Sequence, residues 1–255
     1  MPDFFSVLYA IYFFGMGFLL LVIAAAIKVV TFPFDKTGQL THCFCSWSGH
    51  HFIRVCPSWS VQFDGLSKIE PNMGYVLVAN HQSLMDILVL YGIMRPFKWV
   101  SKEELFKVPV IGWTLTLNQY VRIRRGNGSS TKEMLNSCHY WLTNKTPVMM
   151  FPEGTRSEDG EIQKFRYGAF KLAADADVPI VPIVVDGTRE IMKKGSLHIG
   201  FRSRIRVKAL PPVHPKDFNY DSHALSNYVR SLMIAELSKI RQEAEEQKVI
   251  GIRVA

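Results

Sequence analysis

An uncharged N-terminal segment limits the environment in which this chain can fold. No Asp, Glu, Lys or Arg lies between Asp3 and Lys28, and residues 4–27 are almost all apolar. As a helix they would be about 36 Å long, enough for a bilayer core of about 30 Å. A cleaved signal peptide would have a basic start and a shorter apolar stretch, and a helix covering a core would have a polar face. We therefore expect residues 1–31 to form a membrane anchor helix.

Basic residues follow this apolar segment. Lys28, Lys36 and Arg54 come after it, and no Lys or Arg comes before it. Because loops rich in Lys and Arg stay on the cytoplasmic side of a membrane, we expect the rest of the chain to lie on the cytoplasmic face. Reduced thiols fit that location, since no disulfide spacing is evident among Cys43, Cys45, Cys56 and Cys138.

A second pattern comes directly after the anchor. Leu40, Phe44, Trp47 and His51 recur at helical spacing and predict an interfacial amphipathic connector over residues 32–60. The same stretch holds residues that are metal ligands by type, but their spacing fits no standard zinc pattern. This set consists of His42, Cys43, Cys45, His50, His51 and Cys56. We expect no metal site from it.

Short apolar runs alternate with helical patterns over the rest of the chain. The predicted strands cover residues 75–79, 97–101, 119–123, 147–151, 179–185 and 203–210. The predicted helices cover residues 83–91, 132–143, 165–174 and 222–248. This alternation indicates an α/β fold with a mixed, largely parallel sheet flanked by helices. We expect one globular domain over residues 61–255, ending in a long C-terminal helix.

The charge balance narrows the class of partner. The net charge of +8 favours anionic partners. The Lys and Arg residues are scattered, and the chain has no zinc-finger spacing and no RNA-recognition signature. We therefore expect a lipid bilayer and phosphorylated lipids or small molecules as partners, and no nucleic acid.

A histidine and an aspartate come directly after the first predicted strand of this domain. His81 is separated from Asp86 by four residues, at a carboxyl strand end where α/β proteins place their chemistry. A His with a pKa near neutrality suits general-base work on a hydroxyl, and a carboxylate can fix its tautomer. The stretch from Ser83 to Asp86 also has the pattern of a helix capping box. This segment alone leaves the catalytic and the capping interpretation equally open.

A second polar cluster follows the predicted strand 147–151. Gly154 allows backbone N–H groups to face an anion, and Arg156 can bind a phosphate with two hydrogen bonds. A solvated pair between Glu153 and Arg156 is the competing interpretation. Arg122 stands in the basic run after residues 119–121, and that run could equally be a solvated edge. The candidates for substrate binding in these two segments are Arg124, Arg125, Glu153, Gly154, Thr155, Arg156, Lys164 and Arg166.

Together these residues resemble the glycerolipid acyltransferase family, whose type member is 1-acyl-sn-glycerol-3-phosphate acyltransferase. Residues 80–86 resemble its NHxxxxD block, residues 151–157 its FPEGTRS block, and residues 178–183 its later VPxxPV block. The resemblance covers about residues 32–215. Residues 119–125 depart from the family's second block, because Arg124 stands where Asp is common and the Gly is missing.

The resemblance implies transfer of a fatty acyl group from acyl-CoA or acyl carrier protein to the sn-2 hydroxyl of 1-acyl-sn-glycerol-3-phosphate. The product would be phosphatidic acid, in phospholipid biosynthesis, and no cofactor is implied beyond the acyl-donor substrate. His81 would deprotonate the hydroxyl and Asp86 would orient it. Glu153, Gly154 and Arg156 would help to bind the glycerol phosphate. Pro182 would be structural or would line the acyl-donor site.

Three alternatives remain open at this stage. The acceptor could be another lysolipid, such as lyso-ornithine lipid, because residues 119–125 depart from the family pattern. A lipid hydrolase would use His81 and Asp86 to activate water, but the chain has no Gly-x-Ser-x-Gly elbow. A non-catalytic membrane-binding module would leave lipid products unchanged when His81 is replaced.

Overall fold

A seven-stranded sheet forms the centre of the computed structural model, which describes residues 3–124 and 128–249. The strand order is β1-β7-β6-β2-β5-β3-β4, and β6 and β7 are the one antiparallel pair of neighbours among the described strands. The strands are β1 (Trp59–Asp64), β2 (Val76–Ala79), β3 (Lys98–Lys102), β4 (Val121–Ile123), β5 (Val148–Met150), β6 (Ile180–Asp186) and β7 (Ser203–Ala209). The predicted mixed, largely parallel α/β sheet is confirmed.

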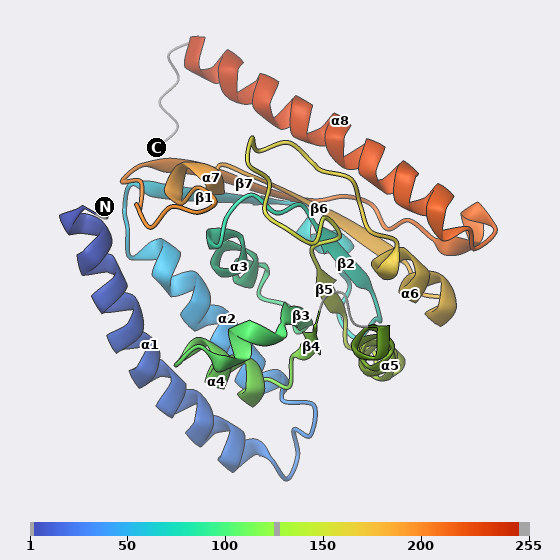
Figure 1. Cartoon of the computed structure of the whole chain (residues 1–255), viewed down its shortest axis with the longest axis horizontal. Coiled ribbons are helices and arrows are strands. Elements are labelled where there is room, and N and C mark those ends of the chain that lie inside the picture. Colours follow the sequence, from blue (N-terminus) through green and yellow to red (C-terminus); the bar gives the residue numbers. More distant parts are fainter. Residues whose placement is uncertain (1–2, 125–127, 250–255) are drawn as a thin grey trace.

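Helices cover both faces of this sheet (Figure 1). One face packs against α1 (Phe4–Thr31), α2 (Gln39–Arg54), α3 (Met85–Leu90) and α4 (Ile111–Leu117). The other packs against α5 (Gly128–Thr143), α6 (Gly168–Ala176) and α8 (Ser222–Val249). The short helix α7 (Thr188–Ile191) follows β6, and four 3₁₀ turns are η1 (Leu66–Lys68), η2 (Tyr91–Ile93), η3 (Glu103–Lys107) and η4 (Pro215–Phe218).

The central strands are apolar because both of their faces are buried. All four residues of β2 and all three of β5 are buried. Alternate residues of β2 enter opposite cores: Leu77 packs with the α1–α3 side and Val78 with the α6 and α8 side. Such continuous apolar runs are what made these strands predictable.

The strand β1 and the short helices α4 and α7 were not predicted from the sequence. β1 is an edge strand in which buried and more exposed residues alternate, and it pairs in parallel with β7, which lies about 140 residues further along the chain. α4 has only seven residues and follows Val110, whose φ is 64°. A positive φ is rare for a β-branched residue, so local sequence preference does not indicate this helix. The division into residues 1–31, 32–60 and 61–255 stays a prediction.

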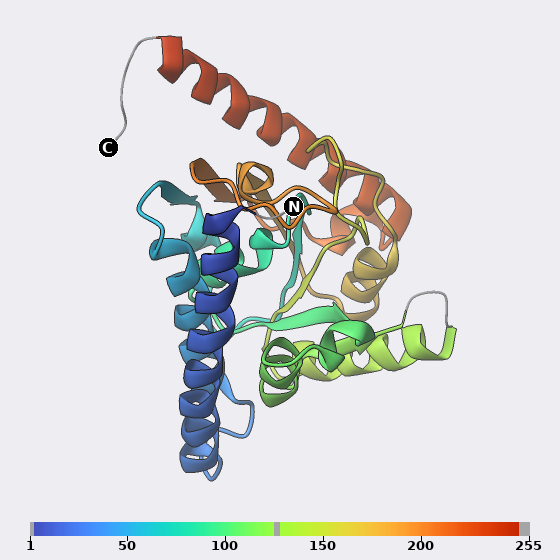
Figure 2. The same cartoon turned by 60° about the vertical axis from the view of Figure 1, so that its left-hand side comes forward.

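Helix α1 is long and largely uncovered. Within the described residues it is the one helix with the length and apolar composition to cross a membrane, and only 11% of its most apolar window is buried. It runs beside α2 (Figures 1 and 2). Tyr9 donates a 2.9 Å hydrogen bond from its hydroxyl to the Phe52 carbonyl, and the Tyr12 hydroxyl lies 2.6 Å from His51 Nε2. The face turned away from α2 exposes Phe4, Leu8, Ile11, Phe18, Val22 and Val29.

The stripe predicted for residues 32–60 lies on the surface of α2. Leu40 and Trp47 are half exposed, and Phe44 and His51 are partly buried. The Trp47 ring packs against both Phe44 and His51. The placement of this stripe in the headgroup layer of a membrane stays a prediction.

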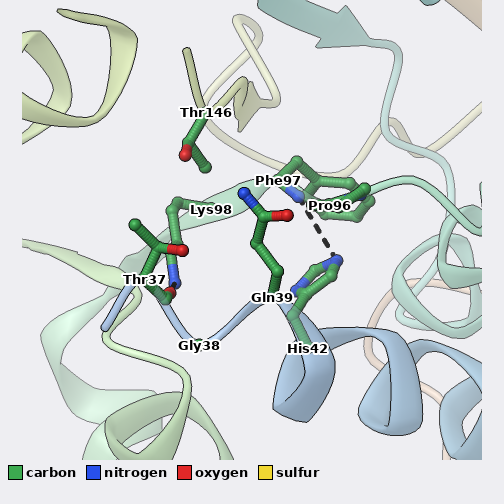
Figure 3. A pocket seen from close by; sticks show the side chains of 8 residues that line it. All are labelled: Thr37, Gly38, Gln39, His42, Pro96, Phe97, Lys98 and Thr146. Atoms are coloured by element: carbon green, nitrogen blue, oxygen red, sulfur yellow. Dashed lines mark hydrogen bonds between the residues drawn. The ribbon is translucent and has the colours of Figure 1, made fainter. Parts of the chain in front are cut away.

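The buried side of α2 is tied to the sheet by polar contacts. Lys98 at the start of β3 is buried and donates to the carbonyl of Thr37 at 2.9 Å and to that of Asn118 at 2.8 Å. Burial lowers the pKa of Lys98 to about 7. His42 Nε2 accepts a 3.3 Å hydrogen bond from the Phe97 N–H (Figure 3). These contacts anchor the connection between α1 and α2 to the domain.

The cysteine and histidine side chains of this stretch point to different neighbours. His42 contacts Tyr120 and His51 contacts Tyr12. Over the described ranges, no three His, Cys, Asp or Glu side chains lie together in a way that could hold a metal ion. The four cysteines are free thiols.

Candidate active site

Three loops meet at one edge of the sheet. They leave the carboxyl ends of β2, β5 and β6, which are parallel neighbours in the order β6-β2-β5. Residues 80–84, 151–157 and 187–188 follow these strands. The two clusters singled out in the sequence, 70 residues apart, therefore lie side by side, as expected for the carboxyl edge of a parallel sheet.

His81 and Asp86 form a hydrogen-bonded pair. His81 Nδ1 lies 2.8 Å from Asp86 Oδ2, and the aspartate is fully buried, whereas 13% of the histidine side chain is exposed. With its proton on Nδ1, the imidazole has a lone pair on Nε2. Nε2 has no hydrogen-bond partner within the part of the chain that the structure describes. This nitrogen is therefore available to take a proton from a bound hydroxyl.

Asp86 also performs the capping role. Its Oδ2 accepts hydrogen bonds from the backbone N–H groups of Gln82 at 2.7 Å and Ser83 at 2.9 Å, just before α3. Its Oδ1 accepts a short hydrogen bond from the Thr188 hydroxyl. The capping and orienting interpretations are thus compatible, because one oxygen serves both the imidazole and the start of the helix. These donors stabilise the charged carboxylate and lock its orientation.

The loop after β5 holds the backbone of His81 from both sides. Glu153 Oε1 accepts a 2.7 Å hydrogen bond from the His81 N–H, and the Ser157 N–H donates to the His81 carbonyl at 2.7 Å. Phe151 stacks on the imidazole with ring centroids 3.9 Å apart and planes 11° apart. Trp99 supports the far side of Phe151 at 5.3 Å. The position of His81 is therefore determined by residues 70 or more positions later as well as by its own strand.

Both oxygens of Glu153 are used inside the protein. Oε1 accepts from His81, and Oε2 accepts a 2.9 Å hydrogen bond from the Gln163 N–H. The side chain is 4% exposed, and burial raises its pKa to about 7. The assignment of Glu153 to acceptor binding stays a prediction, but its contacts are those of a residue that positions His81.

Replacing Glu153 by Gln is expected to change the pH dependence of stability. Folded Glu153 keeps its proton up to about pH 7, whereas an unfolded glutamate releases it near pH 4.5. The folded state therefore binds more protons between these values, so this contribution to stability is present below about pH 4.5 and is lost as the pH rises to about 7. Gln has no such titration. The unfolding midpoints of the wild type and of Glu153→Gln would be measured in detergent at several pH values. As the pH rises from about 4.5 to about 7, the midpoint of the wild type should fall relative to that of Glu153→Gln.

A matched control for this titration lies on α8. Glu246 is exposed, so Glu246→Gln should give a nearly constant difference from the wild type over the same range. A constant difference for Glu153→Gln as well would contradict the assignment of a raised pKa to this buried carboxyl.

The remainder of the second cluster forms an open cationic loop. Gly154 has φ 71°, and a Cβ there would lie 2.7 Å from Arg166 Nε, so the Arg166 side chain covers this glycine. Arg156 is partly exposed and has no hydrogen-bond or ion-pair partner among the described residues. Thr155 and Lys164 are exposed in the same loop. The Arg156 guanidinium therefore has free donors, and Arg156 is next in the chain to Ser157, which holds His81.

The arginines after β4 have internal partners. Arg124 binds Glu103 with two hydrogen bonds, of 2.5 and 2.9 Å, and Arg122 lies over the Phe106 ring at 4.4 Å. Arg125 lies outside the described residues. Pro182 is buried within β6, where its carbonyl accepts a hydrogen bond from Leu210. The substrate-binding roles of Arg124, Arg125 and Pro182 stay predictions.

Several supporting residues were not found from the sequence. Asn80 exchanges two 2.8 Å hydrogen bonds with the backbone of Val185 and so ties the end of β2 to β6. Gln82 donates to the Gly160 carbonyl at 3.1 Å, and Arg241 of α8 donates to the same carbonyl at 2.9 Å. Thr188 supports Asp86. Their partners lie about 80 to 105 residues away, and no local pattern signals such contacts.

The chain is similar in sequence to known acyltransferases. A sequence model of the family described as Acyltransferase matches residues 60–186. The 1-acyl-sn-glycerol-3-phosphate acyltransferase of Chlamydomonas reinhardtii is 38% identical over 213 residues, 80% of this chain and 63% of that protein. The chloroplastic 1-acyl-sn-glycerol-3-phosphate acyltransferase LPAT1 of Arabidopsis thaliana is 36% identical over 173 residues, 65% of this chain and 49% of that protein. The chain thus spans about half to two thirds of the length of these curated relatives.

A solved structure shares the fold. The crystal structure of the 1-acyl-sn-glycerophosphate acyltransferase PlsC from Thermotoga maritima superimposes with a TM-score of 0.77. The match covers 94% of this chain and 98% of that one, at 24% sequence identity. The two chains therefore share the same fold.

Proposed function

This chain belongs to the acyltransferase family, and from that premise we propose that it transfers a fatty acyl group from an acyl thioester to the sn-2 hydroxyl of 1-acyl-sn-glycerol-3-phosphate. The donor is acyl-CoA or acyl carrier protein, and the product is phosphatidic acid, for phospholipid biosynthesis. The observation that carries the proposal is the hydrogen-bonded pair of His81 and Asp86, held by the loop that presents the free guanidinium of Arg156.

The proposed reaction uses the unpartnered Nε2 of His81. His81 Nε2 takes the hydroxyl proton as the hydroxyl oxygen attacks the thioester carbonyl carbon. The tetrahedral intermediate collapses, the C–S bond breaks, and the imidazolium gives its proton to the departing thiolate. Asp86, buried and accepting from His81 Nδ1, stabilises the transient imidazolium. No covalent acyl-enzyme is needed in this sequence.

The cationic loop accounts for a phosphate on the acceptor. A phosphate monoester has oxygens that a guanidinium binds with two parallel hydrogen bonds. Among the described residues neither Arg156 nor Arg166 of this loop has a side-chain hydrogen-bond or ion-pair partner, and Arg156 is the one next to Ser157, which holds His81. Lys164 and Arg166 add positive charge around Gly154. Arg124 contributes less to the positive electrostatic potential of the site, because its charge is paired with that of Glu103.

The apolar helix supports placement at a membrane. The N-terminal end of α1 contacts the globular domain, since Ser6 accepts a hydrogen bond from the Ile199 N–H, and at the other end the Lys28 side chain lies against Gly38 of the connector to α2. A helix that crossed the bilayer would carry one of these contacts to the other side. We therefore propose that α1 inserts into one leaflet. Lys28, Lys36 and Arg54, which follow the apolar segment, would be attracted to the anionic lipids of a cytoplasmic leaflet and so support the cytoplasmic face.

Arg156→Ala is expected to weaken acceptor binding specifically. Losing charge-assisted hydrogen bonds to a phosphate costs about 1.5–3 kcal/mol, so KM for 1-acyl-sn-glycerol-3-phosphate should rise about 10- to 100-fold. The KM for acyl-CoA should be unchanged, and Lys239→Ala, which removes one exposed charge from α8, should match the wild type. Equal KM values for the acceptor in Arg156→Ala and Lys239→Ala would contradict this role.

A panel of acceptors tests the substrate class. Purified protein in detergent would be given acyl-CoA with 1-acyl-sn-glycerol-3-phosphate, lysophosphatidylcholine or lyso-ornithine lipid. The highest kcat/KM is expected for the phosphate monoester. A higher value for lyso-ornithine lipid would overturn the proposed acceptor while keeping the reaction type.

A further inference from the structure

Apolar side chains point outward from the segment after α7. Leu197 is 74% exposed and Phe201 is 63% exposed, whereas Ile199 between them is 4% exposed. Alternation of this kind divides an extended segment into an inner and an outer face. The outer face here is apolar, although the segment also has Ser, Lys and Gly residues available for solvent. We call residues 193–202 the interfacial loop.

The exposure of these side chains is built into the fold. The Gly200 N–H donates to the Ile191 carbonyl at 2.7 Å, and the Trp59 indole N–H donates to the Gly200 carbonyl at 3.0 Å. The Ser58 hydroxyl donates to the Phe201 carbonyl. The backbone is therefore fixed on both sides of Ile199. Leu197 and Phe201 are held outside while their neighbour is buried.

The interfacial loop is joined to the first turn of α1. The Ile199 N–H donates to the Ser6 hydroxyl at 2.8 Å, and His198 Nδ1 lies 3.3 Å from Asp3 Oδ2. The Phe5 and Phe201 rings meet edge to face at 5.4 Å. Phe4, next to this contact, is 83% exposed. The loop thus lies beside the N-terminal end of α1 (Figures 1 and 2), and Leu197 and Phe201 add to the apolar side chains that α1 exposes.

Cations border this apolar surface. Within the loop Lys193 and Arg202 are exposed, and neither has a hydrogen-bond or ion-pair partner in the described part of the chain. Lys194 is paired with Glu158 at 3.0 Å. Apolar side chains flanked by unpaired cations complement the acyl and phosphate layers of an anionic bilayer.

We propose that the interfacial loop docks on an anionic lipid surface, with Leu197 and Phe201 in the acyl boundary and Lys193 and Arg202 at the lipid phosphates. The continuity with the uncovered apolar face of α1 favours a bilayer over a protein partner as the occupant. Contiguous exposed apolar patches mark interaction sites, because monomeric soluble proteins seldom expose large ones.

Docking of this loop sets the depth of the active site. The Ser83 hydroxyl donates to the Met192 carbonyl at 2.7 Å, and Thr188 hydrogen-bonds Asp86, so both ends of the segment 188–192 touch the residues that hold the catalytic pair. A loop seated in the headgroup layer places His81 near the depth of a lysolipid hydroxyl. This consequence rests on the proposed function, whereas the docking itself does not.

The test places an environment-sensitive probe on the loop. Leu197→Cys in a Cys43→Ser background would be labelled with NBD, and the full chain placed in nanodiscs of phosphatidylcholine alone or with phosphatidylglycerol. We expect blue-shifted emission and quenching by chain-brominated lipid, at least about twofold stronger with phosphatidylglycerol. The matched control is Tyr228→Cys on α8, a half-exposed aromatic position that should show neither effect.

Two outcomes would overturn the proposal. Emission at position 197 that matches position 228 in both membranes would place the loop in water, as for a surface that binds a protein. Equal quenching with and without phosphatidylglycerol would contradict a preference for anionic lipid. The same preference would be contradicted if Lys193→Glu/Arg202→Glu kept the stronger quenching in the presence of phosphatidylglycerol. Hydrogen exchange of residues 193–202 in the unmodified chain, with and without nanodiscs, gives the same answer without a probe. None of these readouts depends on catalysis, so their failure is separate from failure of the acyltransferase assignment.

Discussion

His81→Ala is expected to lower kcat for acyl transfer by about 10²- to 10⁴-fold, the usual contribution of a general base. The alanine variant has no group in place of Nε2 to take the hydroxyl proton, while Asp86 keeps its bonds to Gln82, Ser83 and Thr188. The KM values for both substrates should change little. Initial rates of thiol release at saturating lysolipid provide the measurement.

The control separates this effect from loss of folding. His139→Ala removes a histidine that is exposed on α5, and it should retain wild-type kcat. The unfolding midpoint of His81→Ala should fall, because buried Asp86 loses one donor and Phe151 loses its stacking partner, so kcat is compared at a temperature well below that midpoint. A variant that keeps more than a tenth of the wild-type kcat would contradict a base role for His81.

Asp86→Asn is expected to lower kcat by about 10³- to 10⁴-fold, comparable with the effect of the analogous change in the Ser-His-Asp triad. An amide in this place loses the negative charge that stabilises the imidazolium. Its N–H₂ group would also face donors, because Asp86 accepts from His81, from two backbone N–H groups and from Thr188. A loss of stability should accompany the loss of activity, since the side chain is fully buried.

Two comparisons distinguish the orienting role of Asp86 from its capping role. Thr188→Val removes one donor to Oδ1 and leaves the His81 contact, so it should lower the unfolding midpoint with a much smaller effect on kcat. Asp86→Asn should move both quantities. If Asp86→Asn lowered the unfolding midpoint but kept wild-type kcat, Asp86 would be a helix cap alone.

The sequence predicts those parts of this fold whose signal is local. β2, β5 and β6 are short apolar runs buried on both faces, and their carboxyl ends carry the two recognised clusters. The order of strands and helices then suffices to bring residues 80–86 and 151–157 to one edge. β1 and the seven-residue α4 lack such a signal, since one depends on pairing with β7 and the other follows an unusual backbone conformation at Val110.

The site shows the same division. The hydrogen bond between His81 and Asp86 spans five positions and could be anticipated from spacing. The use of both Glu153 oxygens by backbone N–H groups could not, because a motif identifies a residue type without showing where its atoms point. Asn80, Gln82 and Thr188 act through contacts about 80 to 105 residues away, which only the folded chain reveals.

The most direct test of the account is a balance of acyl groups. Purified full-length protein would receive ¹³C-labelled acyl-CoA or acyl carrier protein together with 1-acyl-sn-glycerol-3-phosphate, and both thiol and lipid products would be counted by mass spectrometry. One labelled phosphatidic acid, acylated at sn-2, is expected for each thiol released. Thiol release matched by free labelled fatty acid would indicate a hydrolase and contradict the account.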